Sequence, residues 1–323
     1  MSDNGYAYAV ARIRAKELTL LSAQTLDTLM AAKTAADCVR LLAEKGWGTG
    51  DANQSVSSLL LTEREKTWAL LRELVEDMSV FDVFLLANDY HNLKAAIKLV
   101  YTDQTLAGVY SHNGTVAPEL IYDAVRERDY AALPEGMRAA AEEAYLALSH
   151  TGDGQLCDVI VDRAALQAVL EAGNASAFGL IRSYAQLTAA LANIKIAARC
   201  QKTGKRLEFI IKALCPCEGL DTDSLAVAAA DGFEPMLKYL ETTAFAGAAQ
   251  ALRGSFAQYE RYADNAVMEL IRPQKYHSFT VEPLAAYLLA RENELAMVRL
   301  ILTAKQNQLS EQSVRERLRE MYV

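Results

Sequence analysis

Proline and glycine, the residues that most often interrupt helices, are scarce in this chain, with 6 and 16 occurrences among 323 residues. Alanine, leucine, glutamate, lysine and arginine, which all favour helices, are abundant. No stretch shows the sustained alternation of β-branched and polar residues that a strand needs. We therefore expect an all-α protein made of long helices joined by short loops.

Caps and apolar spacing predict where individual helices lie. Thr34 with Asp37 three residues later resembles a capping box, and Gly46 resembles a helix stop, so a helix is predicted over about 34–45. An apolar seam ending at Val100 predicts another helix that begins after Ser79. Further helices are predicted through the apolar stripe from Trp68 to Met78 and over about 119–129, 135–148, 156–171, 176–203, 245–271, 282–305 and 310–323, with loops at 105–118, 149–154 and 215–223.

A short motif recurs along the chain. Asn-Leu-Lys at 92–94 is followed by Lys98, Asn-Ile-Lys at 193–195 is followed by Arg199, and a degenerate Met-Val-Arg stands at 297–299. The copies lie roughly 100 residues apart, which favours three homologous helical units that stack as a solenoid or close around a pseudo-threefold axis. The units are predicted at residues 1–110, 111–215 and 216–323.

The basic residues of the motif form a candidate partner interface. Residues four apart share one face of a helix, so Lys94 lies beside Lys98, and Lys195 beside Arg199. A solvated polar face would explain each pair separately, whereas recurrence in successive units favours a ring of basic positions presented to one partner. The candidate interface consists of His91, Lys94, Lys98, Lys195, Arg199 and Arg299.

No complete catalytic, cofactor or metal motif is present. Gly204-Lys205 resembles the end of a phosphate-binding loop, but Arg206 stands where Ser or Thr is needed. None of the four histidines follows a glutamate at the spacing of a di-metal bundle. Cys215 and Cys217 are the only close pair among five cysteines, and no second pair completes a zinc site. We interpret them as part of an ordinary loop in a reducing compartment, and the sequence assigns them no role.

Charge and hydropathy narrow the class further. The formal net charge of −8, from 33 basic and 41 acidic residues, counts against a nucleic-acid-binding protein. No apolar run reaches the roughly 20 residues of a membrane span. Charged residues from Arg12 to Glu17 cut through the start of the chain, so it does not read as a signal peptide. We expect a cytoplasmic protein.

Five segments resemble the C subunits of bacterial and archaeal V-type (A-type) ATP synthases, a family whose eukaryotic counterpart is the d subunit of the vacuolar ATPase. Compared with the family, Ala296 and Met297 replace polar residues, and the cysteines near 215 are unusual. The segments are YAYAVARIRAKE (6–17), FLLANDYHNLKAAIK (84–98), ALANIKIAAR (190–199), EPLAAYLLARENELAMVRLILTAKQN (282–307) and RERLREMYV (315–323).

The resemblance implies a funnel-shaped protein of three helical subdomains around a pseudo-threefold axis. It implies a non-catalytic rotor part at the cytoplasmic face of the plasma membrane, which joins the D and F shaft subunits to the proteolipid ring and transmits torque. It also implies no cofactor, no small-molecule substrate and no nucleic-acid partner. The alternatives are a helical-repeat adaptor or RNA-binding scaffold unrelated to rotary motors, and an unrecognised helical enzyme. The sequence does not distinguish H⁺ from Na⁺ coupling, or ATP synthesis from hydrolysis.

Overall fold

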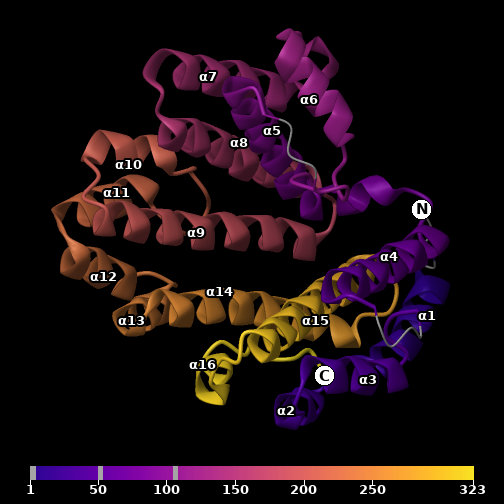
Figure 1. Ribbon diagram of the computed structural model, residues 1–323. Helices are drawn as coiled ribbons and strands as arrows, with labels where there is room; N and C mark the ends of the chain where they lie inside the picture. The colour runs from indigo at the N-terminus through magenta and orange to yellow at the C-terminus, as the bar shows by residue number, and fades with distance from the viewer. Residues whose placement is uncertain (1–4, 50–53, 105–107) are drawn as a thin grey trace. The chain divides into compact units, whose positions relative to one another are not determined.

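The structure is a computed structural model that describes residues 5–49, 54–104 and 108–323. This part of the chain is built from helices (Figure 1), and its only β contact is an isolated antiparallel bridge between Cys217 and Leu220. The prediction of an all-α protein is confirmed. The chain divides into two compact units: unit 1 comprises Met1–Met78 and Gln250–Val323, and unit 2 comprises Ser79–Ala249. The three-unit division by repeats, 1–110, 111–215 and 216–323, stays a prediction.

Unit 1 is organised around one long helix, α15 (Glu282–Gln306). This helix is apolar on most of its surface, as expected for a helix that neighbours cover on several sides. Its residues Val298 and Ile301 share a core with Leu42 and other apolar side chains of the N-terminal helices. The helices and the 3₁₀ segment around α15 are α1 (Ala7–Glu17), α2 (Ala23–Ala31), α3 (Ala35–Glu44), α4 (Val56–Leu74), α14 (Phe256–Ile271), η3 (Arg272–Tyr276) and α16 (Glu311–Arg315).

Unit 2 is a series of helices that pack mainly on their neighbours in sequence. The first group is α5, α6, α7 and α8, and α8 also contacts α9, which in turn contacts α10, α11 and α12. Leu93, Ile121 and Val161 from three of these helices meet in one core. The elements are η1 (Met78–Phe84), α5 (Leu86–Thr102), α6 (Pro118–Glu127), η2 (Tyr130–Ala132), α7 (Glu135–Thr151), α8 (Gly154–Ala175), α9 (Gly179–Lys202), α10 (Leu207–Ala213), α11 (Thr222–Asp231) and α12 (Phe233–Glu241). Helix α13 (Ala246–Gly254) spans the division between the units, since unit 2 ends at Ala249.

The predicted capping box at the start of α3 is present. The Asp37 N–H donates to the Thr34 hydroxyl at 3.1 Å, and the Thr34 N–H donates to the Asp37 carboxylate at 3.1 Å. Gly46 has a φ of 84°, a left-handed conformation that glycine adopts at no steric cost, and it lies just past the end of α3. Local sequence alone therefore predicted both ends of this helix.

Three predicted helices differ from the structure. The helix expected from Ser79 begins only at Leu86, after the 3₁₀ segment η1. The single helix expected over 245–271 is interrupted at Ser255, whose hydroxyl accepts the Gln258 N–H at 3.1 Å as the cap of α14. The predicted helix 310–323 is confined to α16, because side chains of α15 and η3 bind the backbone beyond it: Asn293 donates to Glu320 O at 2.9 Å.

A further difference concerns the segment between α9 and α13. Helices α10, α11 and α12, which follow α9, have no counterpart among the helices expected from sequence. The loop predicted over 105–118 lies partly outside the described residues, since 105–107 are not described.

Candidate functional site

Three of the predicted interface residues lie on α5. Lys94 Nζ lies 2.6 Å from Asp162 Oδ1, and Lys98 Nζ lies 2.6 Å from Asp158 Oδ1, so both lysines form ion pairs with α8. His91 is exposed, with Nε2 3.3 Å from Val109 O, where it donates if that nitrogen carries the proton. The two lysines therefore connect helices within unit 2, and a contact with a partner stays a prediction for all three residues.

Reversing both lysines, Lys94→Glu with Lys98→Glu, should lower the free energy of unfolding. The change removes two ion pairs, each worth about 0.2–1 kcal/mol in partly exposed positions, and gathers four carboxylates between α5 and α8. Adding Asp158→Lys and Asp162→Lys should restore the lost stability, as measured by urea denaturation followed by circular dichroism. If the first double variant unfolds like the wild type, the pairs do not hold the two helices together.

The other predicted positions lie on two different helices. Lys195 is half-buried and Arg199 is exposed on α9, whereas Arg299 is exposed on α15 and lines a surface hollow. The six residues thus lie on three helices, α5 and α9 in unit 2 and α15 in unit 1. Their arrangement as a ring stays a prediction.

The asparagines of the recurring motif bind backbone that lies about twenty residues further along the chain. The Asn92 amide donates to Ser111 O at 2.7 Å and accepts the Ser111 N–H at 2.8 Å. The Asn193 amide does the same with Cys215, donating to its carbonyl at 2.6 Å and accepting its N–H at 2.9 Å. Both asparagines are fully buried. Each asparagine amide therefore forms with one residue the same two backbone hydrogen bonds that a neighbouring β-strand would form. In this way it holds a loop against a helix.

The third copy of the motif divides the same task between two side chains. Met297 Sδ accepts the Arg319 N–H at 3.2 Å, while Asn293, one helical turn earlier, donates to Glu320 O at 2.9 Å. A thioether can only accept a hydrogen bond, so the donor has to come from another residue. The shared contact supports the register in which Met297 corresponds to Asn92 and Asn193.

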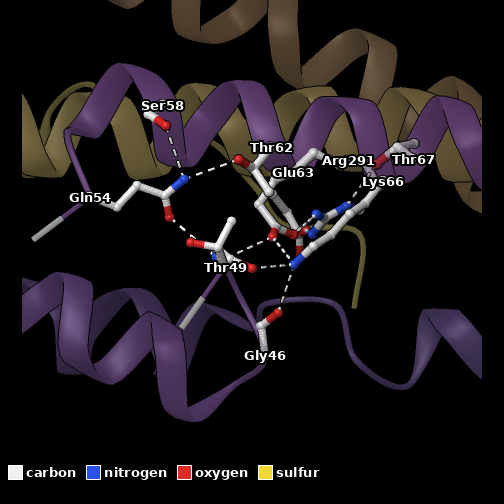
Figure 2. A network of polar contacts seen from close by, with 11 residues as sticks. Gly46, Thr49, Gln54, Ser58, Thr62, Glu63, Lys66, Thr67 and Arg291 are labelled. Carbon is white, nitrogen blue, oxygen red and sulfur yellow. Dashed lines mark hydrogen bonds and ion pairs between the residues drawn. The ribbon is translucent and has the colours of Figure 1, made fainter. Parts of the chain in front are cut away.

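A buried ionic network connects α15 to α4 in unit 1 (Figure 2). Arg291 Nη2 lies 2.7 Å from Glu63 Oε2, and Arg291 Nη1 lies 2.5 Å from Glu294 Oε2. The guanidinium is also 4.9 Å from the centre of the Trp47 ring and donates from Nε to Thr67 Oγ1 at 3.3 Å. Side-chain exposure is only 8% for Arg291, 5% for Glu63 and 2% for Glu294. A charge buried to this degree requires a partner, and here each one has at least one.

The other oxygens of the two glutamates bind backbone from the N-terminal segments. Glu63 Oε1 accepts the Gly48 N–H at 2.8 Å and Lys66 Nζ at 2.7 Å, and the lysine donates onward to Gly46 O and Gly48 O (Figure 2). Glu294 Oε1 accepts the Leu21 N–H. The network thus attaches three segments of the first seventy residues to α15.

Burial raises the pKa of Glu294 to about 7, and the nearby Arg291 charge partly opposes this shift. The shift alone does not indicate general acid–base catalysis, because both carboxylate oxygens are already engaged by the Leu21 N–H and Arg291. The arrangement is suited to holding helices in register.

No metal site emerges from residues 5–49, 54–104 and 108–323. Within them no group of three or more His, Cys, Asp or Glu side chains is placed to hold a metal ion. All five cysteines are unpaired, and Cys215 and Cys217 lie in the loop that Asn193 holds. No helix in these ranges has the length and apolar character required to cross a membrane.

Neither the buried ionic network nor the closeness of Arg317 and Arg319 to Arg299 was predicted from the sequence. The signal for the network was a pair of charged residues, Arg291 and Glu294, inside the apolar run of α15 at positions that its buried face occupies. Charges at interior positions of an apolar helix indicate partners elsewhere in the chain. Glu63 could not be recognised as a buried charge in the same way, because it lies among other charged residues on α4.

The fold and these contacts define an all-helical protein whose buried polar side chains bind its own helices and loops. The sequence model of the ATP synthase (C/AC39) subunit family matches residues 9–317, and the chain belongs to this family of V/A-type ATP synthase subunits. It is similar to the C subunit of the V-type sodium ATPase of Enterococcus hirae. The two sequences are 22% identical over 317 residues, which cover 96% of this chain and 97% of that protein.

Proposed function

We propose that this chain is a non-catalytic central-stalk rotor subunit of a V-type ATP synthase or ATPase. In this role it joins the D and F shaft subunits to the proteolipid ring at the cytoplasmic face of the plasma membrane, and it transmits torque for ion transport. The observation that carries the proposal is the length of the family match, residues 9–317. The match to the C subunit of a V-type sodium ATPase covers nearly the whole of both chains.

The internal contacts are consistent with transmitting torque. A part that passes rotation from one neighbour to another must resist relative movement of its own helices. Hydrogen bonds from Asn92 and Asn193 hold two loops, and the Arg291 network holds α15 to α4. Because a broken buried ion pair is strongly unfavourable, such a network resists sliding of one helix along the other.

We further propose that the basic positions contribute to binding the shaft or the ring. They are His91, Lys94, Lys98, Lys195, Arg199 and Arg299. Charged side chains on helices suit this purpose because they favour one register between partners without exposing a large apolar surface on the free protein.

Isolation of the native complex tests the proposal. The affinity tag belongs at the N-terminus, because Met321 and Tyr322 near the C-terminus are buried. Purification in mild detergent should recover shaft subunits and ring subunits with the tagged chain. Deletion of the gene should abolish ATP-driven ion transport while the soluble catalytic part still hydrolyses ATP. Recovery of RNA or of an unrelated assembly, with no ATPase subunits, would instead favour the adaptor or scaffold interpretation.

A further inference from the structure

A groove runs along one face of α15 in unit 1. It consists of two hollows of about 450 and 400 Å³, which share Leu300, Arg317 and Arg319. The first is lined by α15, α4 and the C-terminal segment, and the second adds α14. We call the combined feature the arginine groove; its lining residues are Arg64, Ala257, Glu260, Arg261, Glu292, Leu295, Ala296, Arg299, Leu300, Thr303, Ala304, Leu309, Arg317 and Arg319.

The lining is strongly basic in a chain whose net charge is −8. Five arginines face only two glutamates. Arg64 is neutralised by Glu292 through two contacts of 2.8 and 2.7 Å, and Arg319 pairs with Asp264.

Arg299 and Arg317 differ from these two arginines. Both are exposed, and neither guanidinium has a hydrogen bond or ion pair with any residue that the structure describes. The groove therefore carries two cationic groups whose pairing capacity is not used within unit 1.

The groove is long and has an apolar floor. Its α15 residues, from Glu292 to Ala304, recur at steps of three and four and so form one helix face. At a rise of 1.5 Å per residue this face is about 18 Å long, or roughly three helical turns. Leu300 and Leu309 provide apolar surface between the arginines, and Leu309 is 50% exposed, whereas Leu295 is buried in the wall of the groove.

This combination of length, charge and apolar floor restricts the ligand. A phosphate-sized anion would occupy a small part of the groove and leave the leucines uncovered. A helix with carboxylates on one edge of its apolar face would cover the leucines and place an acid beside each unpaired arginine. The planar guanidinium group binds a carboxylate through two parallel hydrogen bonds, which gives both strength and orientation.

We propose that the arginine groove binds an acidic amphipathic helix of a protein partner, with carboxylates on Arg299 and Arg317 and apolar side chains on Leu300 and Leu309. The identity of that partner as another component of the V-type ATPase rests on the proposed function. The groove itself rests only on contacts within unit 1.

Site-specific photo-crosslinking in the native complex tests this proposal. A photoreactive amino acid at Leu309 of the full chain should form a cross-link to one acidic amphipathic segment, identified by mass spectrometry. The same probe at Leu146 of α7, which is 45% exposed and lies in unit 2, should not capture that segment. Assembly is measured in parallel, through the shaft and ring subunits that co-purify with the chain.

Charge variants define the chemistry of the contact. Arg299→Glu with Arg317→Glu should reduce the cross-link yield by about tenfold or more. Arg299→Lys with Arg317→Lys should reduce it less, because lysine keeps the charge and loses only the two parallel hydrogen bonds of the guanidinium group. Arg206→Glu, a reversal of an exposed arginine in unit 2, is the matched control and should leave the yield unchanged. Raising the salt concentration should weaken the wild-type cross-link, and a thermal melt verifies that each variant is folded.

The outcomes separate this inference from the proposed function. If the complex assembles with ATPase subunits but the Leu309 probe captures nothing, or the reversal leaves the yield unchanged, the groove inference is wrong and the proposed function stands. If the probe captures an acidic helix of a protein outside the ATPase, the inference stands and the proposed function fails. Binding to anionic lipid vesicles that requires Arg299 and Arg317, with no protein cross-link, would show a lipid ligand and overturn the inference.

Discussion

Arg291→Ala should lower the free energy of unfolding of unit 1 by about 3–5 kcal/mol, the range found when one partner of a buried ion pair is removed. The substitution leaves Glu63 and Glu294, which are 5% and 2% exposed at their side chains, without their central cation. Both tryptophans of the chain lie in unit 1, and Arg291 stacks over Trp47, so tryptophan fluorescence in a urea titration reports this unfolding directly.

The loss of stability caused by Arg291→Ala should also depend on pH. The pKa of Glu294 is already raised to about 7 by burial, and loss of the Arg291 charge raises it further. A carboxyl whose pKa is higher in the folded than in the unfolded state contributes stability at low pH and loses it as pH rises through the folded pKa. The variant should therefore be closer to the wild type at pH 5 than at pH 8.

Arg315→Ala is the matched control for this prediction. Arg315 also pairs with two carboxylates, those of Asp27 and Glu311, but its side chain is 49% exposed. Its loss should lower the free energy of unfolding far less than the loss of Arg291, because solvent screens exposed ion pairs. Equal effects of the two substitutions would contradict the view that burial, and not the number of ion pairs, determines the contribution of Arg291.

Asn193→Ala should destabilise unit 2 by removing both hydrogen bonds to Cys215. Each buried backbone group left unsatisfied costs about 1–3 kcal/mol, and Cys215 N–H and C=O are both affected. Because the tryptophans lie in unit 1, circular dichroism during a urea titration is the appropriate measurement. Hydrogen exchange at the Cys215 amide should accelerate as well, since that N–H loses its acceptor.

Two further variants test whether the number of buried contacts determines the size of this effect. Asn293→Ala removes one hydrogen bond to backbone, at Glu320 O, and should have a smaller effect than Asn193→Ala. Asn307→Ala removes only an exposed contact from the residue just after α15 to Thr303 O, and it serves as the control. A control variant as unstable as Asn193→Ala would mean that buried backbone pairing is not the cause.

Local signals predicted single helices well where their caps and apolar faces coincide. The capping box at Thr34 and the apolar run of 282–306 lead to helices with nearly the predicted ends. The prediction of one continuous helix over 245–271 was wrong at Ser255. The sequence alone does not distinguish a serine inside a helix from one whose hydroxyl caps the next helix. The prediction of a helix over 310–323 was wrong for a different reason. The side chains of Asn293 and Lys275 bind the backbone carbonyl groups of Glu320 and Tyr322.

The candidate interface was predicted from residue type and recurrence. The structure shows that its residues differ in whether their charge is already paired within the chain. Lys94 and Lys98 use their charge on α8, while Arg299 lines the arginine groove. Sequence spacing placed each lysine on the correct helix but carried no information about which helix would pack against it. Arg317 and Arg319 belong to the same groove although they lie far from the motif in sequence, and no periodicity connects them to Arg299.

The helical class, the position of α15, the recurring motif and the family could all be read from the sequence, because propensities, caps and motifs act over a few residues at a time. The packed structure was needed to show that Arg291 lies between Glu63 and Glu294, and that Met297 and Asn293 share the contact that one asparagine makes elsewhere. Glu63 and Arg291 are 228 residues apart. The partner of a buried charge is selected by whichever groups packing brings within hydrogen-bond distance, and nothing in the local sequence specifies that choice.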